Sequence, residues 1–131
     1  MRAGMIMKKN KYHNVKISTP EGNFDSKKEY RDWCYLKTLL KAGEIDNLER
    51  QKEFQLIPTI YTQGGTLKRI SYKADFFFHD KKYNKWVVVD SKGFKTDVYA
   101  LKKRLMLWLY PHITFIERGK SDKTYNNIME Y

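Results

Sequence analysis

Three β-prone segments follow one another in the middle of the chain, and this succession constrains the fold more than any other feature. They span residues 53–61, 67–78 and 85–91, with turn signals at residues 63–66 and 80–84. Consecutive strands joined by short turns predict an antiparallel meander. The three valines at residues 87–89 indicate a strand that is covered on both faces.

A helical pattern precedes these segments, over residues 26–42. Ser26 and Glu29 match a capping box, and Gly43 supplies a C-terminal stop. Trp33, Leu36 and Leu40 form an apolar stripe at helical spacing, and Glu29 falls on the same face. The Glu29 carboxylate is therefore expected to point toward whatever the helix packs on.

A second helix is predicted from Thr96 or Asp97 to about Tyr110, and Pro111 ends it. Its expected apolar face consists of Val98, Leu101, Leu105 and Trp108. A short strand follows at residues 113–117. The order helix, three strands, helix, strand predicts an α/β or α+β fold with a mixed central sheet flanked by helices.

The length of 131 residues suits one domain with a modest core. Residues 1–11 are polar and basic and are expected to form a loose arm. Residues 12–117 form the domain and begin with two short β-prone pieces around a turn at residues 20–23. Residues 118–131 are a polar tail of no predicted role.

The net charge of +11 favours a polyanionic partner, most simply a nucleic acid, although charge also serves solubility. The single cysteine, Cys34, excludes an intrachain disulfide, and there is no Cys/His cluster for structural zinc. No secretion signal or membrane span is expected, which favours a reducing, cytoplasmic setting.

Two carboxylates interrupt the β-prone segments. They are Asp75 and Asp90, and Lys92 follows two residues after Asp90. Residues i and i+2 of a strand share a face, ~6.6 Å apart. If Asp75 pairs near Asp90, the two carboxylates lie within ~5–8 Å. Oxygen ligands at that separation can bind Mg²⁺ or Mn²⁺, and a metal-bound water beside a lysine suits phosphodiester hydrolysis.

Each of these residues also has an ordinary structural explanation. Asp75 can be a bulge or strand-end acid, Asp90 and Lys92 can be strand-end charges, and Ser26 and Glu29 can serve only as a cap. Together, in this element order and in a basic protein, they favour a functional site.

The spacing of these residues resembles the PD-(D/E)XK nuclease superfamily. Ala74-Asp75, a gap of fourteen residues and Asp90-Ser91-Lys92 match its motif, and its core order is αβββαβ. Within that superfamily, the chain is similar to a small phage and prophage family of unknown function. The similar segments are residues 24–30, 43–51, 72–76 and 89–96, within a similarity that runs from about Tyr12 to Glu117.

The resemblance implies roles for individual residues. Asp75 and Asp90 would bind the metal together with the main-chain carbonyl of Ser91, and Lys92 would be the catalytic lysine. Glu29 would be the helix-borne acid, and from the helix it could complete either the first or the second shell of the metal. The sequence departs from the pattern at Ala74, where proline is common, and at Asp90, where glutamate is commoner.

Other residues are weaker candidates. Lys95, Lys102, Lys103 and Arg104 can line a DNA-facing surface, or the last three can form a solvated helix face. Gln51 and His79 are candidate auxiliary residues.

These features lead to the expectation of a Mg²⁺-dependent DNA endonuclease. It would be selective for branched DNA, act as a homodimer, and serve phage DNA replication or recombination in a bacterial host. A catalytically silent DNA-binding module, a phage factor that engages a host protein, and a nuclease acting on RNA are the alternatives.

Overall fold

The computed structural model describes residues 6–9, 15–91 and 96–118. In chain order its elements are β1 (Ile6–Lys9), β2 (Val15–Thr19), β3 (Gly22–Phe24), α1 (Lys27–Lys41), β4 (Ile45–Ile57), β5 (Ile60–Thr62), β6 (Gly65–Leu67), β7 (Ile70–Asp80), β8 (Lys85–Asp90), α2 (Asp97–Leu109) and β9 (Ile113–Glu117). The segment that was expected to be a loose arm thus contains β1, which pairs with β2.

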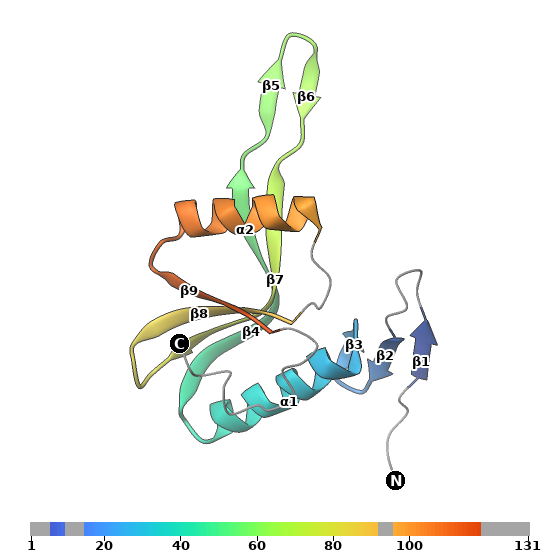
Figure 1. Cartoon of the computed structure of the whole chain (residues 1–131), viewed down its shortest axis with the longest axis vertical. Helices are drawn as coiled ribbons and strands as arrows, with labels where there is room; N and C mark the ends of the chain where they lie inside the picture. The colour runs from blue at the N-terminus through green and yellow to red at the C-terminus, as the bar shows by residue number, and fades with distance from the viewer. Residues whose placement is uncertain (1–5, 10–14, 92–95, 119–131) are drawn as a thin grey trace.

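The central sheet has four strands in the order β4-β7-β8-β9. Strands β4, β7 and β8 pair antiparallel, and β9 joins β8 in parallel after the α2 crossover. The predicted mixed sheet within an αβββαβ order is therefore confirmed, and it is consistent with a restriction-endonuclease-like fold. A second, three-stranded sheet of β1, β2 and β3 lies beside the start of α1 (Figure 1).

Helix α1 begins as its sequence predicts. The Ser26 side chain accepts a hydrogen bond from the backbone N–H of Glu29, and Gly43 beyond the C-terminus has φ 79°. The predicted burial of Glu29 is confirmed, but Leu40 is exposed. The buried face runs through Glu29, Asp32, Leu36 and Leu39, so the stripe was misplaced at its C-terminal end.

Two hydrophobic clusters cover opposite faces of the sheet. The cluster against α1 contains Leu36, Leu39, Ile45, Phe76, Phe78, Val87 and Val89. The cluster against α2 contains Phe54, Leu56, Tyr72, Ala74, Phe77, Val88, Met106 and Ile113. Since neighbouring residues of β8 alternate between the clusters, the prediction that this strand is covered on both faces is confirmed.

Strand β4 begins at Ile45, eight residues before the predicted start at residue 53. Its first half alternates half-buried and exposed residues, so charged side chains occupy the solvent side. The predicted strand at residues 67–78 is divided, because Lys68 and Arg69 interrupt it between β6 and β7. Strands β5 and β6 form an arm that extends away from the sheet, as Figure 1 shows.

The predicted apolar face of α2 is wrong except at Leu105, which is half-buried and packs against the sheet cluster. Val98, Leu101 and Trp108 are exposed, Trp108 to 80%. The helix instead turns Tyr99, Met106 and the following Tyr110 toward the sheet. Neither helix in the described part of the chain is long and apolar enough to cross a membrane.

Candidate active site

The two candidate carboxylates lie on adjacent antiparallel strands. The ladder between β7 and β8 pairs Phe76 with Val89, and one further step along both strands brings Asp75 opposite Asp90. Side chains on directly opposite residues of such a pair have Cβ atoms ~4.5–5.5 Å apart. Both carboxylates are 2% exposed. The two acids are therefore buried neighbours on two central strands, Asp75 in the middle of β7 and Asp90 at the end of β8.

Hydrogen bonds hold both carboxylates in place. Oδ2 of Asp75 accepts a bond of 2.7 Å from the backbone N–H of Ser91. Oδ2 of Asp90 accepts a bond of 2.7 Å from the hydroxyl of Tyr72. The carbonyl of Asp90 accepts a bond of 2.8 Å from the backbone N–H of Arg118, at the end of β9. Strands β7, β8 and β9 are thus joined at Asp90 and Ser91.

Asp75 lies at an irregularity of β7, where the side chains of the alternate residues before and after it point to opposite faces of the sheet. Tyr72 and Ala74 pack in the α2 cluster, whereas Phe76 packs in the α1 cluster. Residues two apart share a face in a regular strand, so the backbone rotates between Ala74 and Phe76. Gln51, which the register places level with Asp75, has φ 56°. Such backbone conformations are uncommon for residues other than glycine and often occur at functional sites.

Glu29 connects α1 to this irregular position. Its side chain is buried, its Oε2 accepts a bond of 3.0 Å from the backbone N–H of Asp25, and its Oε1 accepts one of 3.3 Å from Nε2 of Gln51. The amide of Glu29 itself donates to Ser26. Glu29 therefore serves the N-terminus of the helix and contacts Gln51, the residue level with Asp75.

A buried ionic cluster lies on the other side of Ser91. Oδ2 of Asp32 accepts bonds of 2.9 Å from Oγ of Ser91, 3.1 Å from Nε of Arg118 and 3.2 Å from Nζ of Lys28. Asp32 is 0% exposed, and its Oδ1 has no hydrogen-bond partner among the residues that the structure describes. Ser91 is thus held through its amide by Asp75 and through its hydroxyl by Asp32.

Two tyrosines lie beside the carboxylates on the α2 side. Burial raises the pKa of Tyr72 well above its ordinary value, and the Asp90 carboxylate raises it further. Burial also raises the pKa of Tyr99, whose hydroxyl donates a bond of 2.7 Å to Glu117. The Tyr72 hydroxyl is therefore protonated at neutral pH and donates its hydrogen bond to Asp90.

The donor set of the site suits a hard divalent cation. Asp75 and Asp90 supply carboxylate oxygens, and a main-chain carbonyl such as that of Ser91 is a neutral ligand of the same class. Across residues 6–9, 15–91 and 96–118, however, no three acidic, histidine or cysteine side chains form a group that could hold a metal. Glu29 does not complete such a group. A Mg²⁺ ion here would rest on two carboxylates and keep several waters.

The other candidates lie in several places. Lys92 and Lys95 fall outside the described residues. Lys102 and Lys103 are half-buried, Lys103 bonds Glu117 at 2.5 Å, and Arg104 is exposed.

His79 lies near the turn that joins β7 and β8. It bonds Asp46 through Nδ1 and Asn84 through Nε2, at 3.0 and 2.8 Å. Its ring is thus engaged four residues away from Asp75.

Sequence reasoning missed Asp32, Tyr72 and Arg118. Asp32 falls three residues after Glu29 on the same helix face, which is a signal that helical spacing contained. Tyr72 lies three residues before Asp75, and no local pattern links its hydroxyl to Asp90. Arg118 was assigned to the polar tail, yet it is buried.

A family model described as "Protein of unknown function (DUF1064)" matches residues 9–126. The match spans both helices, the whole central sheet and the Asp75–Asp90 pair. No curated protein and no solved structure matched the chain. Because the family model covers most of its length, the chain belongs to the DUF1064 family.

Proposed function

We propose that this protein is a metal-dependent DNA endonuclease of the PD-(D/E)XK type, selective for branched DNA. The observation that supports this most is the Asp75–Asp90 pair, which is buried on adjacent central strands of an αβββαβ fold. Two buried carboxylates have a high desolvation cost unless a cation or fixed donors balance them. Retaining both in a core is physically reasonable where they bind a metal.

In the proposed reaction, Asp75 and Asp90 hold Mg²⁺ or Mn²⁺ with the Ser91 carbonyl. The bound ion would neutralise charge on the scissile phosphate and lower the pKa of a bound water. Tyr72 and the Ser91 amide keep the two carboxylates in position by donating to one oxygen of each. Lys92, two residues beyond Asp90, is the proposed general base or phosphate-stabilising cation.

The substrate class rests on charge and size. A net charge of +11 favours a polyanion, and a chain of 131 residues has little room for a separate sequence-reading domain. We therefore favour DNA recognised by its structure, with two subunits making paired cuts in a four-way junction. The setting we propose is phage DNA recombination in the cytoplasm of a bacterial host.

A cleavage assay tests the proposal. Labelled four-way junction, flap and linear DNA, with RNA of the same sequence, are incubated with Mg²⁺, Mn²⁺ or EDTA. We expect metal-dependent cuts in branched DNA that Asp75→Asn and Asp90→Asn reduce at least 100-fold, on the order of the loss of a charged catalytic ligand. Asp97→Asn, at the exposed first turn of α2, is the matched control and should cut normally. Full activity of both site variants would refute the assignment.

A second candidate is a DNA-binding protein that has no nuclease activity. It is favoured by the absence of a third metal-binding side chain beside Asp75 and Asp90 among the described residues. This candidate predicts salt-dependent DNA binding without any product in Mg²⁺ or Mn²⁺. A host-protein partner is another alternative, and the exposed apolar residues Val98, Leu101 and Trp108 of α2 favour it. It predicts protein binding and no affinity for DNA at low salt.

A further inference from the structure

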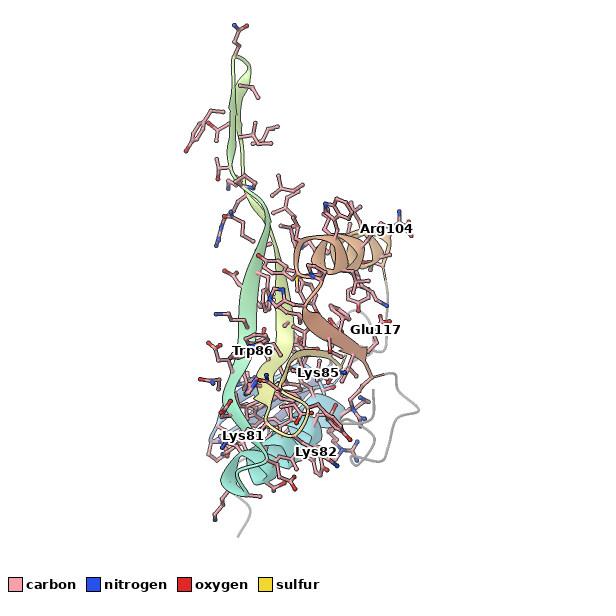
Figure 2. All side chains as sticks on the ribbon, turned by 90° about the vertical axis from the view of Figure 1, so that its left-hand side faces the viewer. Lys81, Lys82, Lys85, Trp86, Arg104 and Glu117 are labelled. Carbon is pink, nitrogen blue, oxygen red and sulfur yellow. The ribbon has the colours of Figure 1, made fainter. Side chains whose placement is uncertain are left out.

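The most exposed element of the structure is the arm formed by β5 and β6. Every residue from 60 to 70 is exposed, and Figure 2 shows the arm as a thin ribbon reaching away from both helices. The strands pair through Ile60 with Leu67 and Thr62 with Gly65, and Gly65 takes φ 135° at the turn. The arm thus has regular backbone pairing but no cover on its two faces.

The charge around the arm has one sign. Residues 54–74, which contain the whole arm and the adjoining halves of β4 and β7, include Lys68, Arg69 and Lys73 but no Asp or Glu. Glu53, just outside this region, lies 3.2 Å from Arg69 and is paired with Lys73 in the β4–β7 ladder, and the side chains of Glu53 and Arg69 are about half exposed. Exposed pairs of this kind contribute little and exchange readily. The arm is therefore suited to a polyanionic partner.

The side chains of the arm complete this match. Tyr61 is 80% exposed, and Ile60 and Leu67 are exposed on one face of the ribbon because they are directly paired. An isolated two-stranded hairpin is marginally stable in water. A two-stranded ribbon fits the DNA major groove, where apolar side chains contact thymine methyl groups, and aromatic rings can stack on unpaired bases.

The arm is in line with the candidate active site. Ile70, at its base, precedes Asp75 by five residues of β7, or ~17 Å at the rise of an extended strand. Gly65, at its turn, precedes Asp75 by ten residues, which limits the span to ~34 Å. At 3.4 Å per base pair, the arm reaches duplex about five to ten base pairs from a phosphate held at Asp75.

We propose that the β5–β6 arm is a DNA-binding ribbon that grips one duplex limb about five to ten base pairs from the point of cutting. The inference rests on the proposed function in that its partner is the DNA substrate. Lys68 and Arg69 contact phosphates, whereas Tyr61, Ile60 and Leu67 enter the groove or lie against exposed bases. The arm thereby sets which limb of a branched molecule lies over Asp75 and Asp90.

The test measures DNA affinity in an Asp75→Asn background, so that cutting does not interfere. Dissociation constants for labelled junctions are measured across a salt series for the unaltered arm, for Lys68→Gln with Arg69→Gln, and for Tyr61→Ala. We expect the double variant to bind about tenfold more weakly and its log–log salt slope to fall by about two, one for each phosphate contact. Tyr61→Ala should lower affinity without changing the slope.

The matched control is Lys81→Gln with Lys82→Gln, which removes the same charge from the β7–β8 turn. Figure 2 shows these lysines at the end of the molecule opposite the arm. We expect the control to bind within about twofold of the parent, since it loses only long-range attraction. Equal weakening by the arm and control pairs would mean that net charge alone acts, and would overturn the inference.

Two further measurements distinguish DNA binding by the arm from a subunit contact and from the nuclease proposal itself. In the first, the duplex limbs of the junction are varied from four to fourteen base pairs. With an intact arm, affinity should rise with limb length up to about ten base pairs and then stay constant, whereas with the altered arm it should not show this rise. Molar mass from light scattering tests whether the arm instead binds a second copy of the chain. If the arm variants dissociate a dimer, the arm is a subunit contact, and the inference is overturned. DNA binding by wild type without Asp75-dependent products would refute the nuclease proposal alone, because arm affinity is measured without cutting.

Discussion

The hydroxyl of Tyr72 donates a hydrogen bond of 2.7 Å to Oδ2 of Asp90, and both groups are buried. The bond joins β7 to β8 beyond their ladder, since Asp90 follows the last paired residue of β8 and Tyr72 lies four residues before Phe76, the last paired residue of β7. A neutral donor fixed by packing can orient a carboxylate without neutralising its charge. The geometry of Asp90 thus depends on a residue that has no chemistry of its own to contribute.

Replacing Tyr72 with phenylalanine should expose this dependence. Hydrogen bonds to charged groups contribute ~1.5–3 kcal/mol, so the free energy of unfolding in urea should fall by about 2 kcal/mol. Loss of a partner that orients a metal ligand should also raise the Mg²⁺ concentration for half-maximal cleavage about tenfold. Tyr110→Phe, which loses a bond of 2.9 Å to the carbonyl of Gln55, is the control and should leave the Mg²⁺ dependence unchanged.

The buried tyrosines predict loss of stability at alkaline pH. In the unfolded chain they ionise near the ordinary tyrosine pKa of 10.0, but burial raises the pKa of Tyr72 and Tyr99 in the folded protein. Their contribution is complete below pH 10 and is lost as pH rises further, by about 1.4 kcal/mol per pH unit for the buried Tyr72 and by less for the half-buried Tyr99. Urea unfolding from pH 9 to 11 should show a shallower decline in Tyr72→Phe and Tyr99→Phe. Slopes equal to wild type would contradict the burial argument.

Asp32 should be among the most sensitive positions for stability. Substitution by alanine leaves the buried Arg118 guanidinium without this carboxylate, and breaking a buried ion pair costs ~3–5 kcal/mol. Ser91→Ala, which removes only one neutral donor to Asp32, should cost about 1 kcal/mol. Chemical denaturation of both variants measures the contrast. Similar losses in the two would show that the charge of Asp32 is not what matters.

The observed packing of α2 predicts that two apolar residues of this helix differ in their contribution to stability. Met106→Ala should lower the free energy of unfolding by ~2–5 kcal/mol, because Met106 is buried in the cluster against the sheet. Leu101→Ala should change it by no more than about 0.5 kcal/mol, because that side chain is exposed. Thermal and urea unfolding are sufficient tests. A large loss for Leu101→Ala would restore the face expected from sequence.

The positive φ of Gln51 predicts that glycine is tolerated at this position better than valine. Glycine accepts φ 56° without strain, which offsets the lost bond to Glu29, so Gln51→Gly should stay within about 1 kcal/mol of wild type. Gln51→Val should cost more than about 2 kcal/mol, because a β-branched residue is strained at positive φ. Comparing the two in urea separates backbone strain from side-chain contact.

The parts of the fold that were predictable from sequence are those that local signals specify. The cap at Ser26, the stop at Gly43 and the turn at residues 63–66 each depend on a few adjacent residues. Those boundaries, joined in order, were enough to predict the αβββαβ arrangement and its mixed sheet. The burial of Glu29 followed from helical spacing alone.

The rest depended on contacts between distant segments. Helix α2 has a regular apolar stripe through Leu101 and Trp108, and nothing local indicates that the sheet accepts Tyr99 and Met106 instead. Asp32 looks like a surface helix acid until Arg118, 86 positions away, is placed beside it. The candidate carboxylates could be found because both lie in apolar runs, but the tyrosine that supports Asp90 could not.

The link between Asp32 and Arg118 also has a consequence for the order of folding. Helix α1 and the meander can form from early parts of the chain, but the carboxylate of Asp32 meets its guanidinium partner only after β9 has joined β8. The same closing step brings the amide of Arg118 to the carbonyl of Asp90. Contacts between such distant residues form late, because a long loop must close first. The candidate active site around Asp90 is therefore complete only after β9 has docked, and a chain that is still being synthesised does not yet contain it.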